Sequence, residues 1–204
     1  MTTDEQVKEI KQSFRQMMDG ATSQSMRAKG LDYHLNWGAT LPRLREKAET
    51  IGKDYALAIA LWKENVRECR ILATMIMPPE QMLPEVVDIW MEQTDTIEIA
   101  EQAAFNLYQH LPYAPDKAFQ WIASDKELSQ VCGFHVLTRL FMSGRVPNER
   151  GINEFVDQSL SAMHSSNVSV RKAAMLSLQR FAELGLVYER ITRTAAHNAG
   201  FDIV

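Results

Sequence analysis

Apolar residues recur every three to four positions along most of the chain, which is the period of an amphipathic α-helix. Near the start, the segment TDEQVKEIKQSFRQMMDG places four apolar side chains on one stripe: Val7, Ile10, Phe14 and Met17. Thr3 and Gln6 stand at the spacing of a capping box, and Gly20 is expected to end the helix. The chain therefore opens with a helix that buries one face.

The same periodicity continues to the end of the chain. TLPRLREKAETIG predicts a helix with Thr40 as its N-cap, Pro42 in its first turn and Gly52 as its stop. Sustained period-two alternation and Asn-Gly or Asp-Gly hairpin turns are absent from the sequence, so no sheet is predicted. Further helices are expected at about 54–64, 66–77, 81–93, 97–111, 115–124, 126–143, 149–164, 167–184 and 186–199.

Short connections force sequential helices to pack as antiparallel pairs, and pairs repeating every ~35–45 residues form a HEAT-type α-solenoid. Three segments share an inner-helix pattern: RECRILATMIM, LSQVCGFHVLTRLF and SVRKAAMLSLQRFAE. Each has a small residue where neighbouring helices would cross closely, namely Ala73, Gly133 and Ala173. The predicted fold is all-α, a HEAT-like α-α superhelix, and a compact helical bundle is the alternative.

Composition limits the class of protein. The 204 residues are 46% apolar and 24% charged, as in ordinary globular proteins. No apolar run approaches the ~18 residues of a membrane span, and the charged N-terminus is unlike a signal peptide, so we expect a cytoplasmic protein. Cys69 and Cys132 lie in apolar helical segments and are expected to be buried thiols. The five histidines have no ligand spacing, so neither a metal nor a cofactor is predicted.

Charge does not by itself favour a nucleic-acid partner. The formal net charge is −4, and no basic block is present. Residues 1–50 carry eight basic and seven acidic groups, whereas residues 51–100 carry four and nine. A surface for DNA would have to be assembled in the fold from scattered Arg and Lys side chains.

Several motifs, in order, resemble the AlkD-like DNA alkylation repair proteins. Residues 37–76 contain the "G-x-x-x-P-x-L-R" helix start, an "LW" pair and an "R/E-x-R/K-x-L/A-A" helix; the matching residues are Gly38, Pro42, Leu44, Arg45, Leu61, Trp62, Arg67, Glu68, Arg70 and Ala73. WIASDKELSQ (121–130) resembles the family's Trp-x-x-Ser-Asp turn, and SSNVSVRKAAMLSLQRFAE (165–183) resembles its late helix. The resemblance predicts a single domain over 1–204, with N-terminal helices at 1–30, family-like repeats at 31–185, and a C-terminal helix and tail at 186–204.

The resemblance also implies a function. Family members are HEAT-like solenoids that hold duplex DNA, and the active ones release N3- or N7-alkylated purines. Cleaving that glycosidic bond requires stabilising positive charge on the sugar. The family uses an Asp one turn after a Trp, a second Trp and an Arg, and the Trp faces stabilise cations by cation–π contact.

Most of that set is missing from this sequence. The "W-x-x-x-D" pattern falls on Ile97 and Glu101, so a carboxylate remains without its aromatic partner. The family's Arg falls at Val131 and its second Trp at Leu176. Because the loss of one positioned electrostatic group costs ~10²–10³ in rate, we expect glycosylase activity to be weak or absent.

Glu101 also belongs to a local acidic cluster with Asp95 and Glu98. One interpretation makes Glu101 the remaining catalytic carboxylate. The other is an acidic first turn stabilised by the helix macrodipole, which is the interpretation we adopt for Asp95 and Glu98. Both interpretations stay open for Glu101.

The candidate DNA-binding residues are scattered cations that would contact phosphates: Arg43, Arg45, Lys47, Arg171 and Lys172. The tryptophans are expected to be core residues, with Trp37 the exception because it lies in a loop before a helix. Three functions follow: an alkylpurine glycosylase, a non-catalytic binder of duplex DNA, or a helical-repeat scaffold for a protein partner. The predicted function is the second, binding of duplex DNA in a concave groove with glycosylase activity weak or lost, and the scaffold is its alternative.

Overall fold

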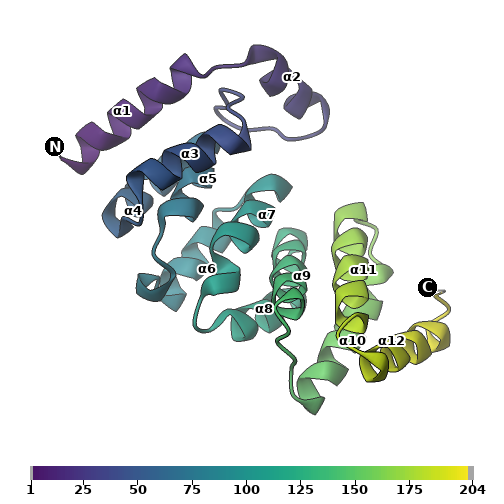
Figure 1. Ribbon diagram of the computed structural model, residues 1–204. Helices are drawn as coiled ribbons and strands as arrows, with labels where there is room; N and C mark the ends of the chain where they lie inside the picture. Colours follow the sequence, from purple (N-terminus) through teal and green to yellow (C-terminus); the bar gives the residue numbers. More distant parts are fainter. Residues whose placement is uncertain (1, 202–204) are drawn as a thin grey trace. The chain divides into compact units, whose positions relative to one another are not determined.

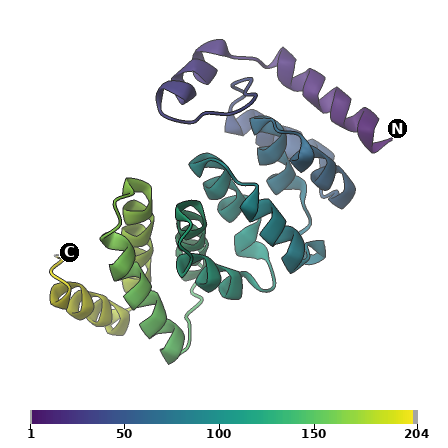
Figure 2. The same cartoon turned by 180° about the vertical axis from the view of Figure 1, so that it is seen from behind.

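The computed structural model describes residues 2–201, which contain twelve α-helices, two short 3-10 helices and no strand (Figure 1). The helices follow one another in chain order, most of them through short connections, whereas a longer segment, residues 29–40, joins α2 to α3 (Figures 1 and 2). Their bounds are α1 Thr3–Gln16, α2 Gly20–Ala28, α3 Leu41–Ile51, α4 Tyr55–Lys63, α5 Arg67–Ile76, η1 Pro79–Gln81, α6 Pro84–Glu92, α7 Ile97–Asn106, η2 Tyr108–His110, α8 Ala114–Ile122, α9 Glu127–Met142, α10 Glu149–Met163, α11 Val168–Ala182 and α12 Leu186–Asn198.

The helices form two compact units, and the boundary lies between Pro112 and Tyr113. In the first unit α5 is the central helix and packs against α3, α4 and α7, while α1 packs on α4. All of α5 except Arg70 and Met75 is buried. Because α3 and α7 both rest on α5, it aligns the two helices that carry most of the predicted site residues.

In the second unit α9 lies between α8 and α11, and α11 also contacts α10 and α12. Gly133 allows the closest approach: a Cβ added there would lie 2.9 Å from the carbonyl oxygen of Ala118 and 2.9 Å from Cγ2 of Ile122. The backbones of α8 and α9 therefore meet at the small residue expected to mark a close helix crossing. Ala73 and Ala173 are buried as well.

Local signals place most helices within one to three residues of their observed bounds. The first helix differs in its details. Its capping box is formed by Thr2 and Glu5 rather than Thr3 and Gln6, because the Glu5 carboxylate accepts the Thr2 backbone N–H over 2.7 Å. Gly20 does not end this helix: α1 ends at Gln16, and Gly20 begins α2 behind an Asp19 N-cap.

The tryptophans are core residues. The rings of Trp62 and Trp90 stack in parallel with centroids 4.1 Å apart. Trp37 is buried too, against Phe14 and under the Arg15 guanidinium, so its loop position does not expose it.

The two cysteines are free thiols in the core, as expected. Burial raises the pKa of the Cys69 thiol to about 12, and it raises the pKa of Cys132 as well. Both thiols are therefore un-ionised at neutral pH, which argues against either as a nucleophile.

Candidate nucleic-acid interface

The three acidic residues around the start of α7 have different environments. Asp95 forms an ion pair with Arg70, with 3.1 Å between Oδ2 and Nη1. Glu98 is held by Arg67 from α5, with its Oε1 2.6 Å from Nη2. Glu101 lies one turn further along and is half-buried. The acidic cluster predicted from spacing is thus divided, and two of its members are bound by arginines.

Glu98 belongs to a buried network. Arg67 donates to both of its carboxylate oxygens, and the Tyr33 hydroxyl donates to Oε2. Tyr33 in turn accepts a hydrogen bond from the Thr96 hydroxyl over 3.1 Å. Burial acts to raise the pKa of Glu98, but the hydrogen bonds and charge of Arg67 outweigh it and leave that pKa below its usual value. Arg67 therefore stabilises the Glu98 carboxylate, a contribution that its position in an acidic first turn did not indicate.

The neighbouring Glu68 is fully buried, and its side chain binds the loop before α3. Its carboxylate accepts the backbone N–H groups of Trp37 and Ala39, over 3.3 and 3.2 Å. Arg67 completes the arrangement by donating to the Ala39 carbonyl oxygen over 2.8 Å. Two residues matched to the family motif, Arg67 and Glu68, are therefore structural, and the sequence alone did not indicate this.

The positions that the resemblance assigns to the family's catalytic groups carry other side chains in this chain. Ile97, one turn before it on α7, is half-buried and aliphatic. Val131 lies in the buried part of α9, so no cation stands at that position. Leu176, on α11, is an aliphatic residue where an aromatic one is needed. Of the positions expected from the resemblance, Glu101 carries a carboxylate, and both interpretations of that carboxylate stay open.

The three cations of α3 point in different directions. Arg43 and Lys47 are four residues apart and share one side of the helix, while Arg45 lies on another. The Arg45 guanidinium lies over the ring of Phe105 on α7, with Cζ 5.8 Å from the ring centroid. Arg43 and Arg45 are exposed and Lys47 is half-buried. The two arginines are open to an anionic ligand.

The adjacent residues Arg171 and Lys172 also differ in how available they are to a phosphate. Nη1 of Arg171 donates to the carbonyl oxygens of Ser165 and Ser166, over 2.6 and 2.9 Å. These carbonyls follow α10, so Arg171 ties the α10–α11 connection and its donors are partly used. Lys172 is exposed and remains a candidate phosphate contact.

A further basic group lies on α1, for which the sequence predicts only a buried stripe. Lys8, Lys11 and Arg15 line a hollow along the helix together with Gln12. Their spacing of three and four residues places them on one side of α1, which is a signal that the sequence carries. Lys11 is paired with Glu64 over 2.6 Å, and Arg15 lies over Trp37. Within the described part of the chain, Lys8 is therefore the cation of this group that is most open to a phosphate.

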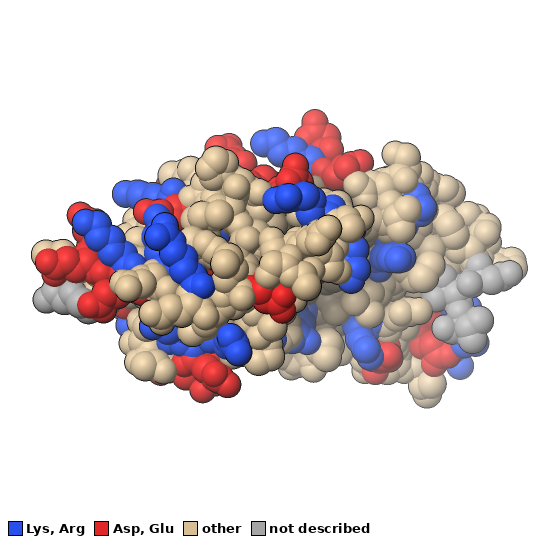
Figure 3. All heavy atoms as spheres, turned by 90° about the horizontal axis from the view of Figure 1, so that it is seen from above, with Lys and Arg blue, Asp and Glu red and all other residues tan. Residues whose placement is uncertain are grey.

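The cations do not form one block on the face drawn in Figure 3. Lys and Arg side chains alternate there with Asp, Glu and uncharged surface. This distribution agrees with the absence of a basic run in the sequence.

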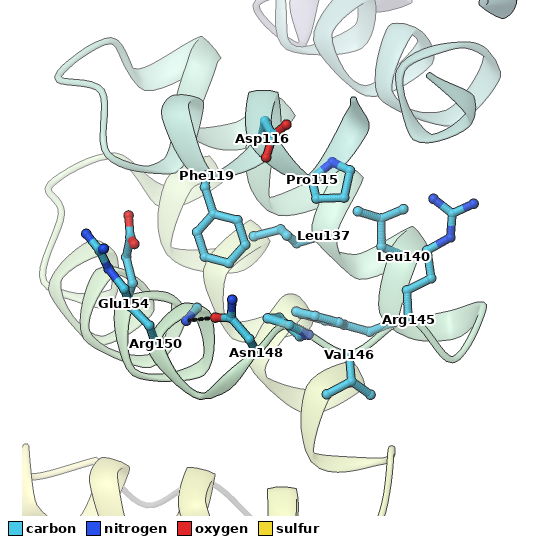
Figure 4. A pocket seen from close by; sticks show the side chains of 13 residues that line it. Pro115, Asp116, Phe119, Leu137, Leu140, Arg145, Val146, Asn148, Arg150 and Glu154 are labelled. Carbon is cyan, nitrogen blue, oxygen red and sulfur yellow. Dashed lines mark hydrogen bonds between the residues drawn. The ribbon is translucent and has the colours of Figure 1, made fainter. Parts of the chain in front are cut away.

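A separate pocket of about 470 Å³ lies within the second unit, between α8, the end of α9 and the start of α10 (Figure 4). Phe119 points into it (Figure 4), and Leu137, Leu140 and Phe141 are among its apolar lining residues. Charged side chains surround the opening: Asp116, Arg145, Arg150 and Glu154. The residues that line this pocket include none of the candidate site residues.

The geometry also bears on two other classes of site. Within residues 2–201, no three His, Cys, Asp or Glu side chains are grouped so that they could hold a metal ion. None of the helices described is both long enough and apolar enough to cross a membrane.

The sequence matches the family model of the DNA alkylation repair enzymes over residues 10–183. The chain belongs to this family. The match spans both units and contains every candidate residue named from the sequence. No curated protein matches the chain.

A solved structure gives the fold of this family member. It is described as "a new family of proteins related to the HEAT-like repeat DNA glycosylases with affinity for branched DNA structures", and it aligns with a TM-score of 0.84. The alignment covers 94% of this chain and 82% of the other, at 18% sequence identity. The predicted HEAT-like all-α fold is confirmed, and the compact-bundle alternative is set aside.

Proposed function

We propose that this protein binds DNA through its duplex regions, including the duplex arms of branched structures, and has little or no glycosylase activity. Three observations support the proposal. The chain belongs to the DNA alkylation repair enzyme family, its fold matches that of a protein with affinity for branched DNA, and α1 and α3 carry exposed cations. The proposed phosphate contacts are Lys8, Arg43, Arg45, Lys47 and Lys172, with Arg171 acting mainly through the α10–α11 connection.

The observation that carries the non-catalytic part is the replacement of the groups expected to act with Glu101. An alkylated purine is already a good leaving group, so the enzyme's task is to stabilise the cationic sugar. One carboxylate contributes to that, but the aromatic faces and the phosphate-binding cation are replaced by Ile97, Leu176 and Val131. Glu101 alone should leave only a small rate enhancement.

DNA binding is tested by titrating a fluorescent duplex and a three-way junction with the protein at about 50 mM and about 200 mM salt. A protein that neutralises several phosphates releases condensed counterions, so its affinity should fall steeply between these salt concentrations. If the protein binds neither the duplex nor the junction at about 50 mM salt, the proposed function is wrong.

Catalysis is tested separately by incubating the protein with duplex DNA carrying 7-methylguanine and measuring the released base. We expect release close to that without protein, and no further decrease in a Glu101→Gln variant. Rapid release that Glu101→Gln abolishes would instead identify Glu101 as the catalytic carboxylate of an active glycosylase.

The second candidate function is a helical-repeat scaffold for a protein partner. The observation that favours it is the pocket of the second unit, with its apolar floor and four charged side chains at its opening. The salt titration distinguishes the two functions, because a scaffold without a phosphate-binding surface has no affinity for DNA at low salt.

A further inference from the structure

An exposed aromatic ring lies beside a guanidinium on the first unit. Phe105 is 42% exposed although it occupies an apolar helix, and its neighbours Ala103 and Ala104 are fully buried. The ring is therefore turned away from the core that the alanines join. Arg45 reaches it from α3, with Cζ 5.8 Å from the ring centroid, within the range of a cation–π contact.

The two helices that carry Arg45 and Phe105 are held by the same core helix. Both α3 and α7 pack on the buried helix α5. The residue after Phe105, Asn106, donates from Nδ2 to the Thr74 hydroxyl of α5 over 3.0 Å, which fixes this part of α7. Because the helix segment is already fixed, a ligand that stacks on the ring has to order mainly the Phe105 side chain itself.

We propose that Phe105 and Arg45 form a stacking platform for a nucleobase that a break or branch in the DNA leaves uncovered. The proposal rests on the proposed DNA-binding function and adds the structural feature of the DNA that is recognised. Every base has a π face, so an aromatic ring binds bases with little regard to sequence. Inside an intact duplex both faces are covered by neighbouring base pairs, whereas a gap or junction exposes one.

The positive charge of Arg45 lets a phosphate bind beside a base that stacks on the Phe105 ring. Arg45 is exposed and has no ion-pair partner among residues 2–201, so its guanidinium can contact a phosphate or the edge of a stacked base.

The test compares duplex DNA carrying a one-nucleotide gap with an intact duplex of the same sequence, length and ends. Phe105→Ala should lower the affinity for the gapped DNA by roughly 5- to 150-fold, the range for removal of one base–aromatic stack. The affinity for the intact duplex should change by less than about 2-fold, since its uncovered base faces are limited to the two ends, which both DNAs share.

Three variants separate stacking from apolar contact and from folding. Phe105→Leu keeps an apolar side chain without a flat ring and should lose as much affinity for gapped DNA as Phe105→Ala, whereas Phe105→Trp should retain it. Ile89→Ala, at a position on α6 that is 51% exposed, is the control for removing exposed apolar surface and should leave both affinities unchanged.

Phe105→Trp also provides a direct signal of stacking. The four native tryptophans are at most 6% exposed, so a tryptophan at position 105 would be the accessible one. Gapped DNA should quench its fluorescence more strongly than intact duplex at equal saturation, and the wild-type protein should show little of this difference.

The outcomes distinguish the two proposals. A wild-type protein that binds neither DNA overturns the proposed function and the platform with it. Normal DNA binding with an equal loss of affinity for gapped and intact duplex in Phe105→Ala overturns the platform alone, as does an unchanged affinity for gapped DNA.

Discussion

The Arg67 guanidinium holds the Glu98 carboxylate through two parallel hydrogen bonds, from Nε to Oε2 over 2.8 Å and from Nη2 to Oε1 over 2.6 Å. The side chains are 1% and 14% exposed, so the pair is largely shielded from water. It joins α5 to α7 across 31 positions of the chain. The acidic start of α7 is therefore first a structural connection, and the stability of the first unit depends on it.

Replacing Arg67 by Met should destabilise the protein by about 3–5 kcal/mol, because it leaves the largely buried Glu98 and Glu68 carboxylates without their cation. The measurement is the free energy of unfolding in urea. Arg193→Ala is the matched control: it removes an exposed ion pair with Glu189 on α12 and should cost at most about 0.5 kcal/mol. Equal decreases in the two variants would contradict the structural role of Arg67.

The same pair makes stability depend on acid pH. The pKa of Glu98 in the folded protein lies below its usual value near 4.5, because Arg67 and the Tyr33 hydroxyl outweigh the effect of burial. The stabilisation is thus complete above about pH 4.5 and is lost as the pH falls through the lower folded-state pKa. Urea unfolding at a series of pH values from about 7 to about 3 should show this decline, and Glu98→Gln should show a shallower decline below pH 4.5. Identical slopes would argue against the shift.

Gly133→Ala should destabilise the second unit by about 1–3 kcal/mol, since the new methyl group would lie 2.9 Å from backbone and side-chain atoms of α8. Thermal unfolding monitored by circular dichroism measures the effect. Gly20→Ala is the control, because no atom lies within 4 Å of its added Cβ and alanine favours a helix. It should be neutral or stabilising, and a Gly133→Ala protein of unchanged stability would show that α8 and α9 can separate.

The cations of α3 should contribute to the salt dependence of DNA binding. A triple Arg43→Ala, Arg45→Ala and Lys47→Ala variant should have a shallower slope of log affinity against log salt, by about 0.9 for each phosphate that it no longer neutralises. Arg190→Ala on α12 removes an exposed arginine outside the proposed surface and should leave the slope unchanged. An unchanged slope in the triple variant would place the phosphate-binding residues elsewhere.

Arg171 and Lys172 are adjacent in sequence and should behave differently. Arg171→Ala should lower stability by about 1–3 kcal/mol, because its guanidinium satisfies two backbone carbonyls after α10. Lys172→Ala should leave the unfolding free energy unchanged and lower DNA affinity alone. Stability and affinity measured on both variants decide whether the two roles are separate.

The fold was largely predictable because its helices are specified locally. Period-3.6 apolar stripes, Pro42 in a first turn and a positive-φ stop at Gly52 each act within one helix. Errors occurred where a neighbouring residue competed for the same role, as when Thr2 replaced Thr3 as N-cap of α1. The sequence predicted N-terminal helices within 1–30 but gave no bounds for α2, because this helix has no fully buried stripe for periodicity to reveal.

The candidate site was less predictable, because its decisive contacts connect residues far apart in the chain. Spacing grouped Asp95, Glu98 and Glu101, but arginines from α5 bind the first two. Arg45 was predicted from its charge, whereas its partner Phe105 could not be, since an aromatic residue in an apolar helix is usually buried. The available signal was that Phe105 stands four residues after the charged Glu101, so both lie on the same side of an alanine-rich helix.

The buried Glu68 carboxylate limits where the protein can be shortened. It accepts two backbone N–H groups, those of Trp37 and Ala39, from the segment that leads from the first two helices into α3. A fragment starting after that segment would expose the core around α5. It would also leave the Glu68 carboxylate without the two backbone N–H donors of the loop. Expression of the repeats alone therefore calls for a start before residue 37, or for a neutral side chain in place of Glu68.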